Sequence, residues 1–564
     1  MNQRIDKGHI PPVFIEILKK RGIEGSEQIT EFLYPRLSDL PGPDLMKGMK
    51  EAVDLLIKYW DNNLPIVVWG DYDVDGTTGT SLLVNFFKKT GREIHWHIPN
   101  RISEGYGLNI DWFNKNNQYN CGNDFLLITV DCGISDADVI RQIQGMGGSV
   151  IVTDHHNLPE TSLPDCVILN PSQEACGFHT TYLAGVGVAF YLAAGIRSRI
   201  LSDKSLKGKI DSINLKQFLA FVALGTIADI VPLSPTNRIL VRGGLEILEH
   251  TEFTGIKALL HSCEIRDGRV SSEDIGFLIG PLINAAGRVG DSQTVVQLLT
   301  SSEENSAIKL VKKLTRLNKK RKKWCIEGLE KIIEKINNTQ VMEDRSIVVA
   351  GDIHQGVAGI IASRLVDLFG VPVIVFAEKN GSAGEKLLVG SARSIEGVSI
   401  VKAISRCNDL LIKFGGHDMA AGAMLFADRL PEFRSKISLY LAEMKDNKKV
   451  TPISNNNFSC SVDNLMSEKY LQLLHLLEPF GPGNDAPHFI DKNAKIINSK
   501  LVGKGAEHLQ VAIRGKYSNY KGIGFGLGKH RDAIQQKPER NMIYSLTRNR
   551  FRGTTSWQVR IIDI

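Results

Sequence analysis

Short apolar runs alternate with helix-like segments over the first part of the chain. Five of these runs are typical of buried β-strands: LPIVVW from Leu64, then REIHWHIPN, DFLLITV, SVIVT and CVILN. Because short apolar strands that alternate with helices form parallel sheets covered on both faces, this pattern predicts an α/β domain. Ligands of such sheets bind beyond the carboxyl ends of the strands, and GDYDVDG, DCG and DHH follow three of the predicted strands.

Two further patterns follow towards the end of the chain. A second α/β unit begins at Ser346 with SIVVAGD, a helix-like HQGVAGIIASRLVDLFG and the apolar run VPVIVFA, followed by the glycine-rich segments VGSARS and KFGGHDMAAG. After the polar run Asn455 to Asn457, short strand-like runs such as HLQVAIRG, GIGFGLG and SWQVRIIDI predict a small β-barrel.

A long amphipathic helix is predicted between the two α/β units, from Glu303 to about Ile336. Apolar residues recur there every three to four positions, and a single helix of this length would reach about 50 Å. From Asn305 to Ile326 it carries nine Lys or Arg residues and no acidic residue. The helix is either a solvated connector or a basic support that lies along a phosphate backbone.

Length and composition limit the class of protein. The chain has 564 residues, enough for three to four domains, with 43% hydrophobic and 23% charged residues, as in ordinary globular proteins. No run of about 18 apolar residues predicts a membrane span, and MNQRIDKGHIPPVF lacks the apolar core of a secretion signal. The eight cysteines form no CxxC pair, so we expect reduced thiols and a cytoplasmic protein.

The net charge of +6 is unevenly distributed. From Thr451 to the end there are 16 Lys and Arg against 9 Asp and Glu, whereas the first 450 residues have a balance of −1. This excess favours a domain that faces a polyanion, although it is also compatible with a surface that only aids solubility. Aromatic and basic residues interleave there, a pattern found both in single-strand binding surfaces and in barrel cores filled with rings.

Three aspartates follow the first predicted strand. If the chain stays extended, the side chains of Asp71, Asp73 and Asp75 point to one side. Three carboxylates at such short distances from one another cannot all stay ionised unless cations compensate their charge. The D-x-D-x-D-G spacing also begins a calcium-binding loop, but the twelfth position is Leu82 instead of a glutamate. A catalytic metal site is therefore favoured over a calcium loop or an exposed loop without a ligand.

Further acids and imidazoles occur where the other elements end. Asp131 follows DFLLITV, Asp229 ends the apolar helix LKQFLAFVALGTIAD, and the run Asp154, His155 and His156 follows SVIVT. Mostly oxygen ligands with one or two histidines suit Mn²⁺ or Mg²⁺ better than zinc. This many acids can hold two ions about 4 Å apart, a pair that activates water and stabilises phosphoryl transfer.

Several polar residues in glycine-containing motifs are candidates for binding the anionic substrate. Glycine lets backbone N–H groups approach an anion and arginine binds phosphate through two hydrogen bonds, although each motif could also be a tight turn. The segment GVGVAF from Gly185 could suggest a dinucleotide-binding loop. It lacks the third glycine, the preceding strand and the acidic residue of such a loop, so we reject that interpretation. The candidates are Arg101 in PNRISEGYG, Asn284 and Arg288 in GPLINAAGRVG, Ser391 and Arg393 in VGSARS, and His417 in FGGHDMAAG.

Taken together, these motifs resemble a known family. GDYDVDGTTG, VDCGIS, DHH, ALGTIADIVPL, GPLINAAGRVG, HQGVAGIIASRL, GSARSI and FGGHDMAAG occur in this order, as in the RecJ single-stranded-DNA exonucleases of the DHH phosphoesterase superfamily. The resemblance covers Trp60 to Gly422 strongly and extends more weakly through EPFGPGNDAPHF into the predicted barrel.

The resemblance implies a fold, an activity and a place in the cell. It implies a parallel-sheet DHH domain and a DHH-associated α/β domain joined by the long helix, followed by an oligonucleotide-binding (OB) barrel. Family members degrade single-stranded DNA from the 5′ end to 5′-mononucleotides with Mn²⁺ or Mg²⁺, in recombination and repair. Single-strand-binding protein and a RecQ-type helicase would be partners, no membrane would be involved, and a monomer is expected. The expected domains are 1–45 (lead), 46–240 (DHH), 241–340 (connector with the phosphate-contact motif and long helix), 341–450 (DHH-associated) and 451–564 (barrel).

It also implies roles for the candidate residues. Asp131 would bridge the two metals, Asp71 would ligate or support them, Asp154 would orient its neighbours and His156 would contact the scissile phosphate. Arg288 and His417 would stabilise the transferring phosphoryl group, while Asn284 would belong with the substrate contacts. The remaining metal ligands would be Asp73, Asp75, His155 and Asp229, and the 5′-end pocket would comprise Arg101, Ser391 and Arg393. Cys132 departs from the family, because many relatives have Asn there.

Two other functions remain open. A small-substrate phosphoesterase of the same superfamily, acting on nano-RNA or nucleotides, would share the metal site, but such chains are shorter and lack a basic third domain. A non-catalytic RecJ-like scaffold in replication would typically have lost metal ligands, and every ligand position is occupied here.

Overall fold

The computed structural model describes most of the chain as two compact units. The described residues are 10–116, 124–160, 162–178, 182–202, 213–265, 270–336, 345–380, 384–445, 456–503, 505–551 and 554–564. The first unit comprises Met1–Ile283, Ser292–Val311 and Ser454–Ile564, and the second comprises Asn284–Asp291 and Lys312–Ile453. The expected absence of a secretion signal concerns a segment whose first nine residues lie outside the described part.

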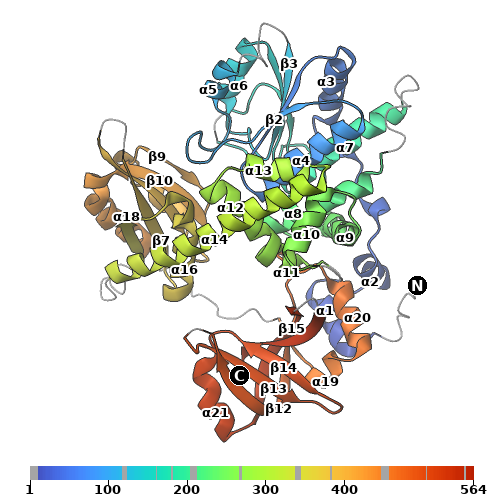
Figure 1. Ribbon diagram of the computed structural model, residues 1–564, viewed down its shortest axis with the longest axis vertical. Helices are drawn as coiled ribbons and strands as arrows, with labels where there is room; N and C mark the ends of the chain where they lie inside the picture. The colour runs from blue at the N-terminus through green and yellow to red at the C-terminus, as the bar shows by residue number, and fades with distance from the viewer. Residues whose placement is uncertain are drawn as a thin grey trace. The chain divides into compact units, whose positions relative to one another are not determined.

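The five predicted strands of the first unit form one parallel sheet (Figure 1). Its order is β2-β1-β3-β4-β5, and each neighbouring pair is parallel. This confirms the parallel α/β fold expected from the alternation of apolar runs and helices. The strands are β1 (Ile66–Gly70), β2 (His95–His97), β3 (Phe125–Val130), β4 (Gly148–Thr153) and β5 (Val167–Leu169).

Helices cover the sheet because its strands are apolar on both sides. Val67 and Trp69 of β1 share a core with residues of α5 (Ile110–Lys115) and α6 (Ala137–Gly145). Figure 1 shows these two helices on one side of the sheet and α3 (Met49–Asp61) on the other. Two further helices pack against each other: α4 (Val74–Lys89) also contacts β1 and β3, and α7 (Gly185–Ser202) also contacts β3 and β4.

A helical region completes this part of the first unit. The apolar segment predicted as one buried helix is a 3₁₀ turn, η6 (Leu215–Phe218), followed by α8 (Leu219–Ala228) with Asp229 at its C-cap. A π-helical turn, η7 (Ile275–Ile279), lies between two of the later helices. The other helices here are α9 (Pro235–Glu249), α10 (Thr254–Ser262), α11 (Ser272–Asp274), α12 (Gly280–Val289) and α13 (Gln293–Leu299).

The second unit is built on a mixed sheet of order β6-β7-β8-β10-β9. The pair of β6 and β7 is parallel, and the remaining pairs are antiparallel. The glycine-rich segments VGSARS and KFGGHDMAAG, for which tight turns were an alternative, lie largely on these antiparallel strands. The elements are β6 (Ile347–Gly351), α16 (Gln355–Phe369), β7 (Val373–Asn380), β8 (Lys386–Arg393), α17 (Ile400–Ser405), β9 (Lys413–Gly416), β10 (Ala420–Phe426) and α18 (Leu430–Lys445).

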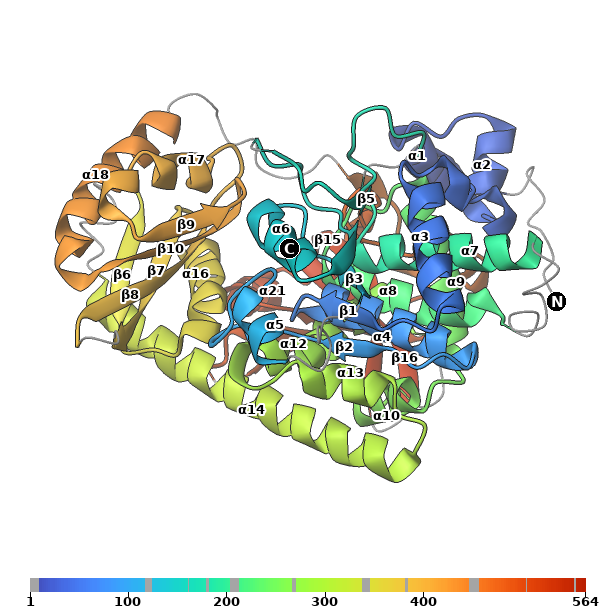
Figure 2. The ribbon, with the colours of Figure 1, turned by 90° about the horizontal axis from the view of Figure 1, so that it is seen from above.

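The predicted long helix is present as α14 (Glu304–Lys335), a single α-helix of 32 residues. Its first turns belong to the first unit and the rest, from Lys312, to the second. Figure 2 shows the helix along its full length. Cys325 and Ile332 are buried in a core shared with α16 and with strands β6 and β7.

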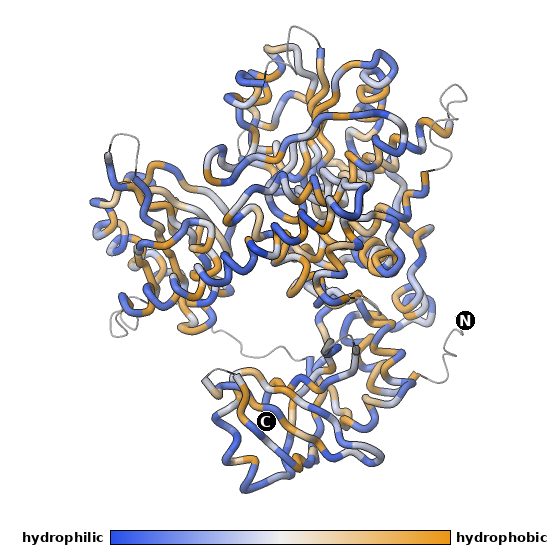
Figure 3. Tube along the Cα trace, viewed as in Figure 1, coloured by the Kyte–Doolittle hydropathy of each residue, from blue (hydrophilic) through white to orange (hydrophobic). Residues whose placement is uncertain are grey.

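The C-terminal strands close into the expected barrel. The order is β11-β12-β13-β14-β16-β15, and an antiparallel pairing of β12 with β15 closes it. Buried and more exposed residues alternate along β13, and Figure 3 shows both hydrophobic and hydrophilic stretches along the barrel strands. The elements are β11 (Asn457–Ser459), α19 (Val462–Leu465), α20 (Glu468–Leu477), β12 (His488–Val502), β13 (His508–Arg514), β14 (Asn519–Gly524), α21 (Arg531–Gln536), β15 (Glu539–Phe551) and β16 (Thr554–Asp563).

The N-terminal segment shares its core with this barrel, a contact between the two ends of the chain that the sequence pattern did not reveal. Residues of α1 (Pro12–Lys20) and α2 (Ser26–Leu33), such as Phe14, pack with Leu473 and Phe489 of the barrel region. The buried Arg238 of α9 donates to the carbonyl oxygens of Phe32, at 2.5 Å, and Leu476, at 3.0 Å. Since both carbonyls lie at helix C-termini, where a cation is stabilised, Arg238 ties α9 to α2 and α20.

Within the described residues, we find no helix that combines the length and the apolar character needed to cross a membrane. The seven described cysteines are all free thiols, in line with the expectation of reduced cysteines.

Candidate metal centre

The parallel pairing of β1, β3 and β4 brings the acidic segments to one edge of the sheet. Gly70 at the end of β1 pairs with Val130 at the end of β3, and Val130 pairs with Thr153 at the end of β4. The next residues along the chain are therefore Asp71, Asp131 and Asp154. The topology explains how residues far apart in the sequence reach one place.

The first acidic segment does not stay extended, which corrects the simplest expectation for its three aspartates. Asp73 is the N-cap of α4, and its Oδ1 accepts the backbone N–H of Gly76 at 3.0 Å. The chain turns into a helix there, so Asp75 lies in the first helical turn. Asp71 and Asp73 group with Asp131, whereas Asp75 groups with His155 and Asp229. The aspartates thus reach two neighbouring ligand groups instead of one face.

The fully buried Asp75 is held by the start of another helix. Its two carboxylate oxygens accept the backbone N–H groups of Gly185 at 2.6 Å and Val186 at 2.8 Å, the first residues of α7. A helix N-terminus stabilises a negative charge. A Cβ atom on Gly185 would come within 2.6 Å of the Cβ of Asp131, so only glycine allows this approach. The GVGVAF motif, rejected as a dinucleotide loop, therefore supports an acidic side chain of the protein itself.

Asp131 has an unusual backbone and an unusual side-chain environment. Its φ angle is 63°, in the left-handed region that residues other than glycine seldom adopt, and such conformations cluster at functional sites. Its side chain is 3% exposed, and Oδ1 lies 3.0 Å from Nε2 of His155. No donor hydrogen-bonds to this buried Oδ1 among the described residues, and the same holds for Oδ1 of Asp71.

The DHH motif divides into a supporting acid and two imidazoles. Oδ1 of the buried Asp154 accepts the backbone N–H groups of both histidines, at 2.7 and 3.1 Å, and lies 2.7 Å from Nδ1 of His156. Oδ2 accepts the backbone N–H of Ile134 at 3.0 Å. Asp154 is thereby engaged on both oxygens and fixes His156, as expected for a residue that orients the ligands.

His155 lies at the centre of the second ligand group. Its Nε2 is 3.5 Å from Oδ2 of Asp229 and 3.8 Å from Oδ2 of Asp75, in addition to its contact with Asp131. The side chain of Asp229 is 28% exposed and that of His155 is 15% exposed. The centre is therefore enclosed on the side of Asp75 and open on the side of Asp229.

Charge repulsion and burial disfavour the ionised carboxylates in this cluster. Burial, followed by repulsion from neighbouring aspartates, raises the pKa of Asp75 to about 7 and that of Asp229 to about 9. The same causes raise the pKa values of Asp71 and Asp131 well above the usual range. In the protein alone, these four acids resist ionisation. A bound cation would offset the repulsion between their carboxylates and favour the ionised forms.

The two members of the supporting pair shift in the opposite sense. Although burial alone would lower the pKa of His156, its hydrogen bond to Asp154 and the surrounding carboxylates raise it to about 9. Burial would raise the pKa of Asp154, but the hydrogen bond with His156 lowers it below the usual value. In the protein without bound metal, both shifts favour a protonated His156 held on an ionised Asp154.

The donor set fits hard divalent cations. Ligand atoms of three groups each lie within 4.8 Å of one another: Asp131 with His155 and His156, Asp75 with His155 and Asp229, and Asp71 with Asp73 and Asp131. The groups share Asp131 and His155, so two ions could be held side by side. Carboxylate oxygens with one or two imidazoles suit Mn²⁺ or Mg²⁺, as the sequence predicted.

Two aromatic residues near the centre were not among the sequence candidates. Tyr106 makes edge contacts with His156, at 6.2 Å between ring centroids, and with Tyr72, at 6.3 Å. The exposed guanidinium of Arg101 stacks over the ring of Tyr72 at 5.1 Å. Both tyrosines lie in motifs already noted, GDYDVDG and SEGYG, where their position beside polar candidates was the available signal.

The other predicted anion contacts lie in the second unit. Asn284 and Arg288 are one turn apart on α12, which places them on the same face of that helix. On β8, Nη1 of Arg393 donates to Oγ of Ser391 at 3.3 Å, and Gly359 of α16 leaves room for both side chains. His417 lies in the turn between β9 and β10, where its N–H donates to the carbonyl oxygen of Ala420 at 2.8 Å.

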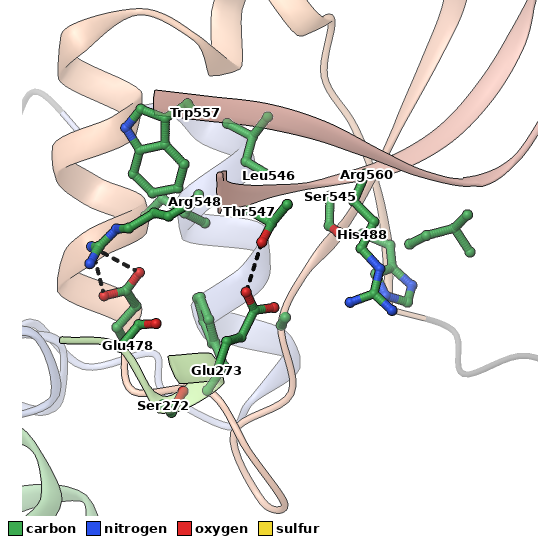
Figure 4. Close-up of a pocket in the computed structure, with 15 residues that line it drawn as sticks. Ser272, Glu273, Glu478, His488, Ser545, Leu546, Thr547, Arg548, Trp557 and Arg560 are labelled. Carbon is green, nitrogen blue, oxygen red and sulfur yellow. Dashed lines mark hydrogen bonds and ion pairs between the residues drawn. The ribbon is translucent and has the colours of Figure 1, made fainter. Parts of the chain in front are cut away.

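The barrel region holds a cavity of about 310 Å³ that the sequence did not predict (Figure 4). Arg548 of β15 stacks over Trp557 of β16 at 5.3 Å and pairs with Glu478 at 3.2 Å. Thr547 donates to Oε2 of Glu273 at 2.7 Å, so barrel and helical region meet at this cavity. Because Arg548 already has a carboxylate partner, the cavity is less suited to an anion than its arginines suggest.

A second barrel surface lies on β13 and β14, the face on which OB barrels bind oligonucleotides. Tyr517 in the turn between these strands is 86% exposed, and the ammonium of Lys516 lies 5.0 Å from its ring. Phe525, just after β14, is 59% exposed and contacts His508 edge-on at 5.2 Å. Exposed rings beside cations can stack with bases of a single strand.

Comparison with known protein families identifies three domains in the chain. Residues 65–226 match the DHH family N-terminal domain, residues 344–443 match the DHHA1 domain, and residues 459–563 match the RecJ OB domain. The three matches follow the order of the parallel-sheet region, the mixed-sheet region and the barrel.

Full-length relatives agree with these matches. The single-stranded-DNA-specific exonuclease RecJ of Escherichia coli (strain K12) is 34% identical over 575 residues, which cover 98% of this chain and 96% of the relative. The corresponding protein of Bacillus subtilis (strain 168) is 33% identical over 558 residues, 98% of this chain and 68% of the relative.

Solved structures extend the agreement to three dimensions. RecJ of Thermus thermophilus in complex with Mn²⁺ superposes with a TM-score of 0.78 at 28% identity, covering 98% of this chain and 76% of that one. Its complex with Mg²⁺ gives a TM-score of 0.71 at 26% identity, with 98% and 74% covered. The domain composition, the relatives and the metal-ligand geometry agree, and this chain belongs to the RecJ family of the DHH superfamily.

Proposed function

We propose that this protein is an exonuclease that hydrolyses single-stranded DNA with two divalent metal ions, Mn²⁺ or Mg²⁺. The observation that carries the proposal is the convergence of Asp75, Asp131, His155 and Asp229, whose three carboxyl groups all resist ionisation in the protein alone. The membership in the RecJ family, whose curated members act on single-stranded DNA, supports the same activity.

The residues of the chain divide into ligands and supports. Asp71, Asp73, Asp75, Asp131, His155 and Asp229 would hold the ions, with Asp131 shared between them. When bound, two divalent ions supply Lewis acidity at the scissile phosphate and offset the charge that develops there. Asp154 keeps His156 on its Nδ1 side, so that Nε2 of His156 is the nitrogen that would donate a proton or a hydrogen bond to a phosphate oxygen.

The second unit would supply the contacts that fix the substrate. We assign Arg288, assisted by Asn284, and His417 to the transferring phosphoryl group. Arg101, Ser391 and Arg393 are assigned to the 5′ end. An arginine and a hydroxyl hydrogen-bonded to one another, as Arg393 and Ser391 are, can bind a terminal phosphate together. Recognition of the 5′ end would make degradation proceed in the 5′→3′ direction. Each hydrolysis step would then release a 5′-mononucleotide.

The test is degradation of end-labelled oligonucleotides with Mn²⁺, using the Asp131→Ala variant as the control. Single strands with a free 5′ end should be degraded, whereas duplexes and strands blocked at the 5′ end should be degraded more slowly. A block at the 3′ end should leave the rate unchanged. If Asp131→Ala retained the turnover of the wild type, the two-metal assignment would be wrong.

The alternative within the superfamily is a phosphoesterase for very short substrates. Comparing the rate on a dinucleotide with that on a strand of about 30 nucleotides separates the two. The barrel favours the long strand, because the exposed rings of Tyr517 and Phe525 can stack with bases of a single strand. A dinucleotide hydrolysed faster than the long strand would support the alternative.

We further propose that the protein acts in the cytoplasm as a monomer, in recombination and repair. A RecQ-type helicase that exposes 5′ tails and a single-strand-binding protein that coats them would provide its substrate. Single-turnover degradation of a coated and an uncoated strand, each with and without the helicase, tests this. No change of rate with either protein would contradict the partnership.

A further inference from the structure

The long helix α14 presents a row of cations that the proposed catalytic function does not use. We call the set Lys312, Lys313, Arg316, Lys319, Lys320 and Lys323 the basic stripe. At 100° per residue, these six positions fall within about 120° of the helix circumference. All six residues are exposed. Most of the positive charges between Asn305 and Ile326 are therefore gathered on one face, with Arg321 and Lys322 outside it.

The opposite face of the helix anchors it in the second unit. Leu314 is fully buried, and Cys325 and Ile332 belong to the core formed with α16, β6 and β7. Because one face is fixed in a core, the basic stripe is carried by a rigid element and cannot turn away from a partner. Such an arrangement holds the charges at regular spacing.

The stripe receives little compensation from acidic residues of its own helix. No Asp or Glu occurs between Asn305 and Ile326, and the next acidic residue along the helix is Glu327. Lys323, at the end of the stripe, lies 3.7 Å from Glu327. The ammonium of Lys320 lies over the ring of Trp324, 4.2 Å from its centroid, and not on a carboxylate. The charge pattern is complementary to a polyanion.

The spacing and the scarcity of free rings indicate which polyanion fits. From Lys312 to Lys323 the helix rises about 16 Å, a length along which each strand of a duplex carries about five phosphates. Single-strand sites combine a cationic groove with stacking rings, whereas sequence-independent binding of a duplex rests on contacts with its phosphates. Trp324 is the aromatic residue of α14, and its ring already contacts Lys320 and His354, the latter at 4.4 Å between ring centroids.

We propose that the basic stripe binds the phosphate backbone of double-stranded DNA, namely the duplex from which the single-stranded substrate emerges. This goes beyond the proposed function, because it concerns a different DNA segment that is not degraded. The contact carries no sequence information and is governed by the release of counterions.

The experiment measures DNA binding by fluorescence anisotropy in EDTA, so that no strand is degraded. The test variant is Lys312→Gln/Arg316→Gln/Lys319→Gln, in which glutamine keeps the helix propensity and each change removes one charge. The matched control, Lys379→Gln/Lys386→Gln/Lys402→Gln, removes three exposed charges elsewhere in the same unit. The ligands are a blunt 20-base-pair duplex and a single strand of 20 nucleotides, between 50 and 200 mM salt.

The stripe variant should bind the duplex about tenfold more weakly at low salt. The slope of log K against log salt should become shallower by up to about 2.7, at 0.9 for each lost phosphate contact. Its affinity for the single strand and the duplex affinity of the control should each change less than threefold. The charge-preserving variant Lys312→Arg/Arg316→Lys/Lys319→Arg should bind the duplex as the wild type does.

Three results would overturn the proposal. The stripe and control triples could lose duplex affinity equally, the stripe variant could lose single-strand affinity as much as duplex affinity, or duplex binding could be unaffected. Asp131→Ala separates this proposal from the catalytic one, because it should abolish degradation and leave duplex binding unchanged.

Discussion

Two regions of this protein concentrate charge of one sign, and they do so in opposite settings. At the metal centre, Asp71, Asp75 and Asp131 are buried and face one another across the edge of a sheet. On α14 the cations of the basic stripe stand side by side on an exposed helix face. The first set is almost shielded from bulk water, whereas the second set is exposed to it.

This difference determines what each set requires. Buried like charges repel strongly in a medium of low polarity, so the acids either bind protons or bind cations, and the site as a whole depends on each member. Exposed like charges are screened by water and salt, so each lysine contributes separately and moderately. We therefore expect all-or-none effects at the metal centre and graded, salt-dependent effects on the stripe.

The largest expected effect comes from neutralising Asp75, which acts both as a proposed ligand and as the acceptor for the start of α7. Asp75→Asn keeps an oxygen for one of the two N–H groups but removes the charge, so turnover should fall on the order of 10³-fold, while the stability falls by about 1–3 kcal/mol for the one buried N–H left without an acceptor. Asp75→Ala should also lower the stability, by about 1–3 kcal/mol for each buried N–H left without an acceptor.

Turnover with Mn²⁺ and thermal unfolding in EDTA, measured for both variants, separate the two roles. Asn85→Ala is a control at another buried polar residue of α4 that lies away from the centre and should affect stability alone. If Asp75→Asn were fully active, the idea that each buried acid is indispensable would fail.

A smaller effect is expected for Asp154, which supports the centre without belonging to the ligand groups. Asp154→Asn should reduce kcat about 10- to 100-fold, in the range of residues that orient metal ligands. Because Asp154 raises the pKa of His156, the variant should also shift the pH profile of kcat to lower pH. The measurement is kcat from pH 6 to pH 10 with saturating Mg²⁺. A reduced kcat with an unshifted profile would show that Asp154 is only structural.

The sequence predicted those ligands of the centre that directly follow the predicted strands. Parallel strands place their carboxyl ends together, so Asp131 and His155 could be assigned to one edge from the order of apolar runs alone. The ligand group that the side chain of Asp75 joins could not be predicted in this way. It depends on Asp73, which caps α4 and so ends the extended segment. Nor could the partner of Asp75 be predicted, since the N–H groups of Gly185 and Val186 reach it over more than a hundred residues of chain.

The fold outside the centre shows the same limit. The single helix α14 and the barrel follow from periodicity, which is local information. The shared core of the N-terminal helices and the barrel depends on contacts between the two ends of the chain, for which Phe14 and Phe489 carry no local signal. The strand character of VGSARS and FGGHDMAAG was obscured because glycine is depleted in strands.

The pH dependence of metal binding should sharpen the contrast. In metal-free protein the raised pKa values of Asp75, to about 7, and Asp229, to about 9, mean that the folded state binds more protons than the unfolded chain. The stability that these protons provide is complete below the unfolded pKa of about 4 and is lost as the pH rises through 7 and 9. Bound Mg²⁺ takes the place of the protons and removes this loss.

The increase in Tm caused by Mg²⁺ should therefore be larger at pH 9 than at pH 6, by about 2–4 °C for each kcal/mol gained. Scanning calorimetry with 10 mM Mg²⁺ or with EDTA at both pH values tests this. In Asp229→Asn, which cannot ionise, the difference between the two pH values should shrink. If the increase in Tm did not depend on pH, the proposal that bound metal ions displace protons from these acids would be wrong.

The smallest expected effect is that of a single charge on the basic stripe, and it is the result that most directly opposes the behaviour of the metal centre. Lys320→Gln should weaken duplex binding about two- to threefold at 50 mM salt and leave single-strand turnover unchanged, because neighbouring cations keep most of the field. At 200 mM salt the difference should become smaller still. Adding Lys312→Gln and then Arg316→Gln should multiply the loss in even steps, since separately solvated charges act additively. A single change that abolished binding would mean that the stripe acts as one cooperative site, as the buried acids are expected to do, and that exposure does not make its charges independent.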